Sequence, residues 1–468
     1  MSQIQDTATQ ARYAIARRAR DARFDGEFFI AVRTTGIYCR PICPATPPLE
    51  RNVRYYATAI SAAEAGFRPC LRCRPDSAPH SFAWLGTDTS FHRALRLIND
   101  GALQDGSISD LAARLGMSDR YLRQLFNDKL GTSPKRYAIY QQCLFAKKLL
   151  HETSLPITDI AFAAGFRSVR RFNEAMRAEL GMPPSKIRQP NSRSRAVVTL
   201  KVHYRPPYDW SALQQFLVLR AIAGLEVVTE SSYGRSFQLG STRGYFSVRP
   251  QLDKHYFDVD IHVEDTRQLN KVLQHVRVML DADAPITAID QHLSTLLTDS
   301  LRYQPGLRIP GIWSVFEAGV RAVLGQQVSV SAAHKLVTAL VHALGEPAEY
   351  AGFSGQFFFP TPASVLESDL AFLRMPGSRK ATLHALARHC IEADNPDDVD
   401  AWLAIKGIGS WTINYVKLRA CRNPDVWLTG DAGLRNALAA IETTIDPDAA
   451  RPWRSYLTFQ LWHQLANA

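Results

Sequence analysis

Four cysteines near the start of the chain have the types and spacing of a metal site. Cys39 and Cys43 form a Cys-x3-Cys pair, and Cys70 and Cys73 form a Cys-x2-Cys pair. In a reducing compartment such a quartet indicates zinc held by four thiolates, usually as a closed structural site. The other three of the seven cysteines are isolated, as expected for small buried side chains. Spacing alone therefore predicts a structural zinc site.

The segments around these cysteines are rich in arginine and resemble a known family. I-A-V-R-T-T-G-I-Y-C-R-P-I-C (30–43) and G-F-R-P-C-L-R-C (66–73) resemble the N-terminal domain of the Ada regulators, which repair methylated DNA. The resemblance covers residues 10–76 and implies that Cys39 accepts a methyl group from a methylphosphotriester. It also implies DNA contacts by Thr35, Arg68 and Arg72. Arg33 and Arg40 are expected around the same site, where zinc keeps the sulfur deprotonated and nucleophilic.

Residues 85–190 contain an internal repeat of a helix, a glycine turn and a basic helix. The first helix of each copy ends at Gly116 or Gly165, and Ser118 or Ser168 then caps the second helix. Two copies 49 residues apart indicate a double helix-turn-helix, and the repeat resembles the DNA-binding region of the AraC/XylS activators. A solvated helix face is the alternative. The side chains expected to contact bases or phosphates are Arg120, Arg123, Gln124, Arg170 and Arg171, with Asn127, Arg167 and Asn173 beside them.

The distribution of charge supports a nucleic-acid partner for this half. Residues 1–190 hold 28 Lys and Arg against 17 Asp and Glu, whereas residues 191–468 hold 27 of each. All of the net charge of +11 therefore lies in the first 190 residues. Basic domains favour polyanions because binding releases counterions. The alternative is that the excess of positive charge only keeps the protein soluble. We expect double-stranded DNA, both alkylated and promoter DNA, and RNA polymerase as partners.

A glycine pair and a later aspartate mark the second half. In A-I-K-G-I-G-S-W-T-I-N-Y-V-K-L-R-A (404–420), Gly407 and Gly409 lie between two expected helices, 399–404 and 410–420. Such a hairpin offers backbone N–H groups to a phosphate. With Asp431 following 22 residues after Gly409, the stretch resembles the helix-hairpin-helix DNA glycosylases. Within them, the AlkA type is matched by P-P-Y-D-W-S, R-A-V-L-G-Q-Q-V-S-V, F-P-T-P and P-W-R-S-Y, in order, across residues 197–465.

This resemblance implies a site for excising alkylated purines such as 3-methyladenine. Asp431 would stabilise the positive charge that develops on the sugar, since a cationic base leaves without a strong acid. The expected base pocket comprises Trp411, Tyr415, Trp462 and Phe216, although Phe216 is nearly as compatible with an ordinary core position. Trp411 stands where bifunctional glycosylases carry a Schiff-base lysine, which predicts hydrolysis without strand cleavage. Gln327 occupies the position of the residue that fills the gap left by the flipped base.

The sequence predicts a multidomain α+β protein that is mostly helical. The expected order is a zinc domain (1–80), a double helix-turn-helix (85–190), a linker (191–195), a sheet subdomain (196–280) and a helix-hairpin-helix glycosylase domain (281–468). No run approaches the ~18–20 apolar residues of a membrane span, and the first ten residues lack a signal peptide's apolar core. We expect a cytoplasmic monomer with Zn²⁺ as cofactor. The alternative is an AraC-type regulator whose second half is a catalytically inactive partner-binding module.

Overall fold

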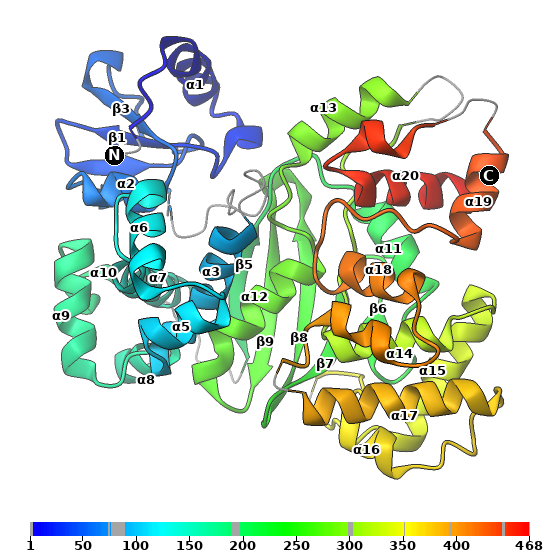
Figure 1. Cartoon of the computed structure of the whole chain (residues 1–468). Helices are drawn as coiled ribbons and strands as arrows, with labels where there is room; N and C mark the ends of the chain where they lie inside the picture. Colours follow the sequence, from blue (N-terminus) through cyan, green and yellow to red (C-terminus); the bar gives the residue numbers. More distant parts are fainter. Residues whose placement is uncertain are drawn as a thin grey trace. The chain divides into compact units, whose positions relative to one another are not determined.

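The computed structural model describes residues 3–73, 75, 89–188, 197–297, 303–350, 352–393, 395–441 and 445–467. The chain forms two compact units: one of residues 1–206, 251–274 and 282–285, the other of residues 207–250, 275–281 and 286–468. Helices dominate both, as expected (Figure 1). Among the described helices, none combines the length and apolar character that a membrane span requires. The expected linker 191–195 lies outside the described residues.

The first unit begins with a small four-stranded sheet that carries the cysteines. Its strands are β1 (Phe29–Val32), β2 (Ile37–Cys39), β3 (Val53–Tyr56) and β4 (Arg68–Pro69), in the order β3-β1-β2-β4. β1 is antiparallel to both neighbours, whereas β2 and β4 run parallel. Helix α1 (Thr7–Ala19) contributes Tyr13 to an aromatic core with Phe28 and Tyr55, and helix α2 (Ala59–Glu64) packs on the sheet.

The repeat of residues 85–190 folds as two helix-turn-helix units around one long helix. The helices are α3 (Thr89–Asn99), α4 (Ala102–Asp105), α5 (Ile108–Arg114), α6 (Asp119–Leu130), α7 (Pro134–Glu152), α8 (Ile157–Ala163), α9 (Val169–Leu180) and α10 (Pro184–Ile187). As predicted, Ser118 and Ser168 cap α6 and α9 by accepting hydrogen bonds from backbone N–H groups. Both second helices end at a left-handed glycine, Gly131 or Gly181. Helix α7 is buried along most of its length.

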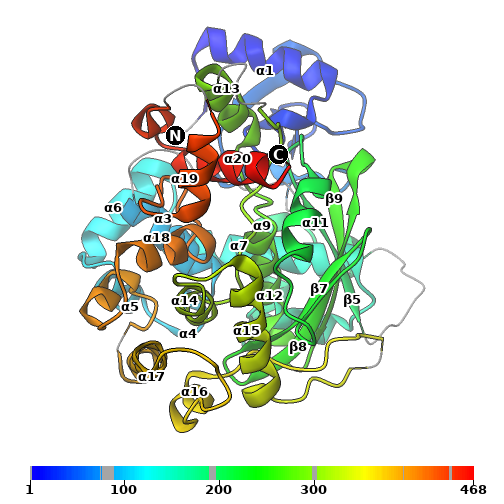
Figure 2. The same cartoon turned by 90° about the vertical axis from the view of Figure 1, so that its right-hand side faces the viewer.

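A second sheet follows, with five strands in the order β5-β9-β8-β7-β6. Figure 2 labels four of these strands, β5, β7, β8 and β9. Its strands are β5 (Val198–His203), β6 (Glu226–Val228), β7 (Tyr233–Leu239), β8 (Thr242–Gln251) and β9 (Tyr256–Val263). The sequence pattern predicts β5, β8 and β9. In β5 and β9 buried residues alternate with more exposed ones, as in β5, where Val198, Leu200 and Val202 are buried. Helices α11 (Trp210–Val218) and α12 (Leu269–Met279) belong to this region, so helical structure begins before residue 281.

The rest of the second unit is helical. Its elements are α13 (Ile286–Leu296), α14 (Val315–Leu324), α15 (Val330–Leu344), α16 (Pro362–Glu367), α17 (Gly377–Glu392), the 3-10 helix η7 (Val399–Ala404), α18 (Ser410–Arg419), α19 (Ala432–Ala439) and α20 (Arg454–Ala466). Helix α14 packs against α15, α17 and α18, with the fully buried Trp402 in their common core. This helical core positions the hairpin between η7 and α18.

Candidate metal centre and base-excision site

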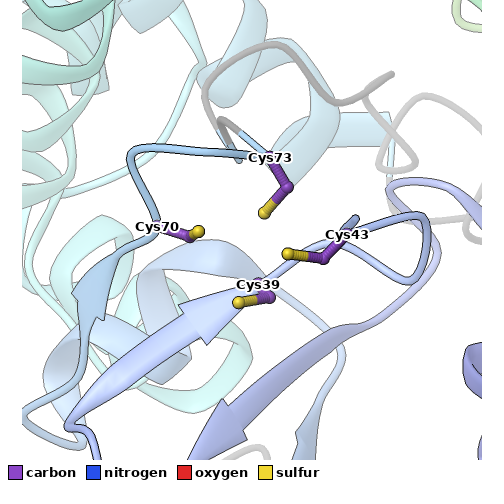
Figure 3. Close-up of side chains that lie close together, drawn as sticks. All are labelled: Cys39, Cys43, Cys70 and Cys73. Carbon is purple, nitrogen blue, oxygen red and sulfur yellow. The ribbon is translucent and has the colours of Figure 1, made fainter. Parts of the chain in front are cut away.

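Two parallel strands bring the two cysteine pairs together. Tyr38 of β2 lies opposite Pro69 of β4, so Cys39 and Cys70, each the next residue, emerge at the same end of the sheet. The second cysteine of each pair returns in the turn after its strand. All four sulfur atoms lie within 4.8 Å of one another and point toward a common centre (Figure 3). The first pair is half-buried and the second is buried, so Cys39 is among the more accessible thiols.

This donor set fits a zinc ion. A Zn–S bond of ~2.3 Å places tetrahedral sulfurs roughly 3.8 Å apart, in keeping with the cluster. Hydrogen bonding with Cys39 lowers the pKa of Cys43 to about 7, whereas hydrogen bonding with Cys43 raises the pKa of Cys39. Four adjacent thiols therefore cannot all be ionised without a cation to balance them. Zn²⁺ is the cofactor that the cluster accommodates.

Arg40 has a different role from the one that sequence analysis expects. It lies beside the cysteines, as expected, but its side chain does not face DNA: it is only 2% exposed and forms an ion pair with the buried carboxylate of Asp25. The Nε–Oδ1 distance of this pair is 2.7 Å. The Arg40 backbone N–H also donates to the Sγ of Cys73, and its Nη1 donates to the carbonyl of Cys73. Arg40 thus supports the metal loop, which is the turn of residues 70–73 that carries the second cysteine pair, from inside the domain.

The other residues expected to contact DNA lie at or near the surface of the first unit. Thr35, Arg72, Arg120, Arg123, Gln124, Arg170 and Arg171 are exposed, and Arg68 is half-buried. Arg170 forms an exposed ion pair with Glu174 in the same helix. Sequence analysis misses Tyr121, whose ring is 54% exposed on α6 between two of these residues. The sequence could have indicated Tyr121 as a DNA-contact residue, because it places an aromatic side chain at an outward position of the helix.

The glycine hairpin has the geometry that a phosphate site needs. Gly407 has a φ of +95°, and a Cβ there would lie 2.2 Å from the Oγ1 of Thr382, so only glycine fits. Gly409 caps α18 with extended backbone and open space around it. Both glycines are exposed, which leaves the first N–H groups of α18 accessible to an anion. The helix before the hairpin is 3-10, not α-helical.

Two tryptophans hold the carboxylate of Asp431. Trp411 Nε1 donates to Asp431 Oδ2 over 3.2 Å, and Trp462 Nε1 donates to Asp431 Oδ1 over 3.0 Å. Asp431 also caps α19 by accepting the N–H of Leu434 at 2.8 Å. The Trp411 ring stacks on that of Tyr415, with centroids 5.5 Å apart. The carboxylate is thus fixed against an aromatic wall, half-buried, with its oxygens oriented by three N–H groups.

Phe216 contacts both aromatic rings and guanidinium groups next to this aromatic wall. Its ring lies 5.4 Å from that of Phe459, which in turn contacts Trp462 at 5.1 Å. The guanidinium of Arg220 lies 3.9 Å from the Phe216 centroid, and that of Arg419 lies 4.9 Å from it. Burial, together with the charge of Arg419, lowers the pKa of Arg220 to about 10, and Asp431 opposes this shift. Sequence analysis misses both arginines.

Comparisons with known proteins agree with this geometry. Three family models match: the metal binding domain of Ada over residues 12–76, a helix-turn-helix domain over 111–190 and the AlkA N-terminal domain over 199–314. The probable bifunctional transcriptional activator/DNA repair enzyme AlkA of Mycobacterium tuberculosis is 36% identical, over 97% of this chain and 96% of that protein. The chain belongs to this bifunctional family. It joins an Ada-type activator and methyl acceptor to an AlkA-type 3-methyladenine DNA glycosylase.

Two relatives in Escherichia coli correspond to the two halves of this family. DNA-3-methyladenine glycosylase 2 is 32% identical, over 56% of this chain and 96% of that protein. The bifunctional transcriptional activator/DNA repair enzyme Ada is 37% identical, over 36% of this chain and 46% of that protein. The chain therefore matches nearly the whole of that glycosylase but only about half of the length of that Ada protein.

Proposed function

We propose that Cys39 is the methyl acceptor of the Ada-type half and that Asp431 is the catalytic carboxylate of the AlkA-type half. The observation that supports the second assignment best is the double clamp on Asp431. Two indole N–H groups from separate helices orient one carboxylate beside an aromatic wall and a phosphate-binding hairpin. A partner-binding module with no activity has no need of such an arrangement, which disfavours the rival function.

Methyl transfer follows from the accessibility and charge of Cys39. Its sulfur attacks the methyl carbon of a methylphosphotriester; the S–C bond forms, the C–O bond breaks, and the phosphodiester leaves as an anion. Bound zinc keeps the four sulfurs ionised and lowers the cost of their mutual repulsion. The triester is neutral, so an anionic cluster can approach it more easily than an ordinary phosphate. A thioether is a poor leaving group, and the reaction stops after one transfer.

Base excision uses the fixed negative charge of Asp431. As the N-glycosidic bond breaks, positive charge develops on the sugar, and a preorganised carboxylate stabilises it without reorganising. The base leaves as a neutral molecule, and water adds to the sugar carbon and loses a proton to the solvent. Trp411, Tyr415, Trp462 and Phe216 form the expected walls for the base. Because Phe216 already contacts two guanidinium groups and Tyr415 contacts one, Trp411 is the better stacking partner for a cationic purine.

We infer that excision leaves an abasic site and that the strand stays intact. Strand cleavage of the lyase type needs a free amine at the sugar. The position beside the hairpin is occupied by Trp411, whose indole is engaged with Asp431. The lysine of α18, Lys417, forms an ion pair with Asp400 at 2.6 Å. Incubation with alkylated DNA should therefore release base without nicking the strand until alkali is added.

The loop between α14 and α15 supplies the proposed wedge into the DNA stack. Gln327 is exposed and has a left-handed backbone, with a φ of +56°. Its neighbour Gln326 ties the loop to the hairpin by donating to the carbonyl of Gly407 at 2.9 Å. We propose that Gln327 inserts into the DNA beside this hairpin, where its amide can hydrogen-bond to the unpaired partner base.

We further propose that the protein acts in the cytoplasm as a monomer and recruits RNA polymerase at promoters. The basic first half and two exposed recognition helices support promoter binding. The test of the whole assignment is release of free 3-methyladenine from alkylated DNA by purified protein, with Asp431→Asn as the matched control. Release by the wild type alone supports it; release by neither protein contradicts it.

A further inference from the structure

Two side chains of helix α7 bind the backbone N–H and carbonyl groups of Lys201 on β5. Lys148 Nζ donates to the Lys201 carbonyl at 2.5 Å, and the Lys201 N–H donates to Glu152 Oε2 at 3.0 Å. Lys148 and Glu152 also form an ion pair at 3.1 Å, with side chains only 6% and 5% exposed. A buried ion pair persists where its remaining hydrogen-bonding capacity is satisfied. Here the backbone of Lys201 provides one partner for each charge.

The place of β5 in its sheet explains why this contact forms. β5 is an edge strand and pairs with β9 on one side only. Edge strands leave backbone donors and acceptors open on the other side, and proteins cover or block them. The two side chains of α7 take the place of a neighbouring strand at Lys201. β5, β9 and α7 accordingly belong to the same compact unit as the cysteines.

A second contact connects the end of this segment to the metal loop indirectly, through Asp25 and Arg40. Arg205 is 3% exposed, and its Nε donates to the carbonyl of Asp25 at 2.8 Å, while its Nη1 donates to the carbonyl of Asp283 at 3.1 Å. Asp25 is the residue whose carboxylate binds Arg40. Arg40 in turn binds both the sulfur and the carbonyl of Cys73. Arg205 is therefore connected to the metal ligand Cys73 through only two residues, Asp25 and Arg40.

We propose that residues 198–205 are an internal docking strand that couples the metal loop to the second sheet. The docking surface consists of Lys148 and Glu152 on α7 and the backbone of Asp25. Because these contacts form only in the docked state, whatever stabilises the metal loop also stabilises the docked strand, and the reverse holds by linkage. This proposal concerns the metal loop itself and does not depend on methyl transfer or base excision.

Hydrogen exchange of the Lys201 amide in the full chain tests the docking contacts. We expect Glu152→Ala and Arg205→Met each to accelerate exchange in β5 at least tenfold. Arg243→Met is the matched control, since Arg243 of β8 forms an exposed ion pair with Glu346 and should leave β5 unchanged. Circular dichroism and zinc content identify any variant that fails to fold. Should Arg205→Met fail, Arg205→Lys, which keeps the charge and loses the forked donors, replaces it.

Metal removal tests the coupling. Chelation of zinc from the wild-type chain should accelerate exchange of the Lys201 amide at least tenfold, and it should have a smaller effect in Arg205→Met, where the connection is already broken. Exchange in β7 should stay constant throughout. Equal exchange of the Lys201 amide in all variants, or a chelation effect of the same size with and without Arg205, would overturn the proposal.

Discussion

Replacing Asp431 by Asn should abolish base excision and leave the rest of the molecule intact. The carboxylate accepts three hydrogen bonds, from Trp411, Trp462 and the backbone N–H of Leu434. An amide keeps one acceptor oxygen and presents an NH₂ group to one of the indole N–H groups, so the substitution loses both the charge and one hydrogen bond. Since the side chain is nearly isosteric, the aromatic wall should keep its shape.

The size of the effect follows from the lost charge. A unit negative charge at ~4 Å from the developing positive charge on the sugar, at an effective dielectric constant near 20, contributes about 4 kcal/mol. Since about 1.4 kcal/mol is tenfold in rate, Asp431→Asn should slow excision about 10³-fold. Single-turnover release of 3-methyladenine from alkylated DNA measures this rate directly. Trp411→Phe, which keeps the ring and removes one indole donor, should lose about tenfold.

Zinc content and promoter affinity are the controls for this variant, and both should match the wild type. Excision by Asp431→Asn at the wild-type rate would refute the assignment of the carboxylate. An equal loss in Trp411→Phe and Asp431→Asn would show that the aromatic wall, and not the charge, dominates the barrier.

Three further predictions concern other parts of the chain. Gln327→Ala should weaken binding to DNA with an abasic site much more than binding to intact duplex, measured by titration of both; equal losses would make Gln327 an ordinary groove contact. Methylation of Cys39 changes the formal charge of the zinc cluster from −2 to −1, which relieves repulsion against a phosphate ~4–8 Å away by roughly 2–4 kcal/mol before screening. Promoter affinity at low salt should therefore rise at least tenfold. No gain over the unmethylated protein, or the same gain in Cys39→Ser, refutes the switch. Glu317→Ala removes the carboxylate that pairs with the buried Arg235 at 2.8 Å. This should lower the free energy of unfolding by about 3–5 kcal/mol, measured by denaturant titration. A loss below about 1 kcal/mol would show that Glu226 or water takes over the role of the Glu317 carboxylate.

Much of the metal centre could be predicted because its determinants are local. Cysteine spacing defines the ligands, and short strands with tight turns bring each pair together. The helix-turn-helix repeat is equally readable, since serine caps and glycine ends act within one or two turns of helix. The place of Arg40 beside the cysteines was predicted, but its burial was not, for the opposite reason. Its partner Asp25 lies on the far side of β1 in the sequence, and only the fold brings the two into one buried site.

The excision site shows the same limit. Glycine spacing indicates the hairpin and its distance to Asp431 indicates the catalytic residue, but neither shows that two tryptophans orient the carboxylate. Those hydrogen bonds depend on how α18, α19 and α20 pack. The two arginines beside Phe216 come from different helices or their ends, 199 residues apart, and no local pattern joins them.

The central claim is that one chain carries both a methyl acceptor and a base-excising enzyme. The most direct measurement follows labelled methyl groups from methylated DNA after incubation with purified full-length protein. We predict label in two products: free 3-methyladenine, which is lost in Asp431→Asn, and one equivalent on the peptide that contains Cys39, which is lost in Cys39→Ser. Label confined to the DNA after incubation with the wild-type protein, or both products lost in either single variant, would contradict it.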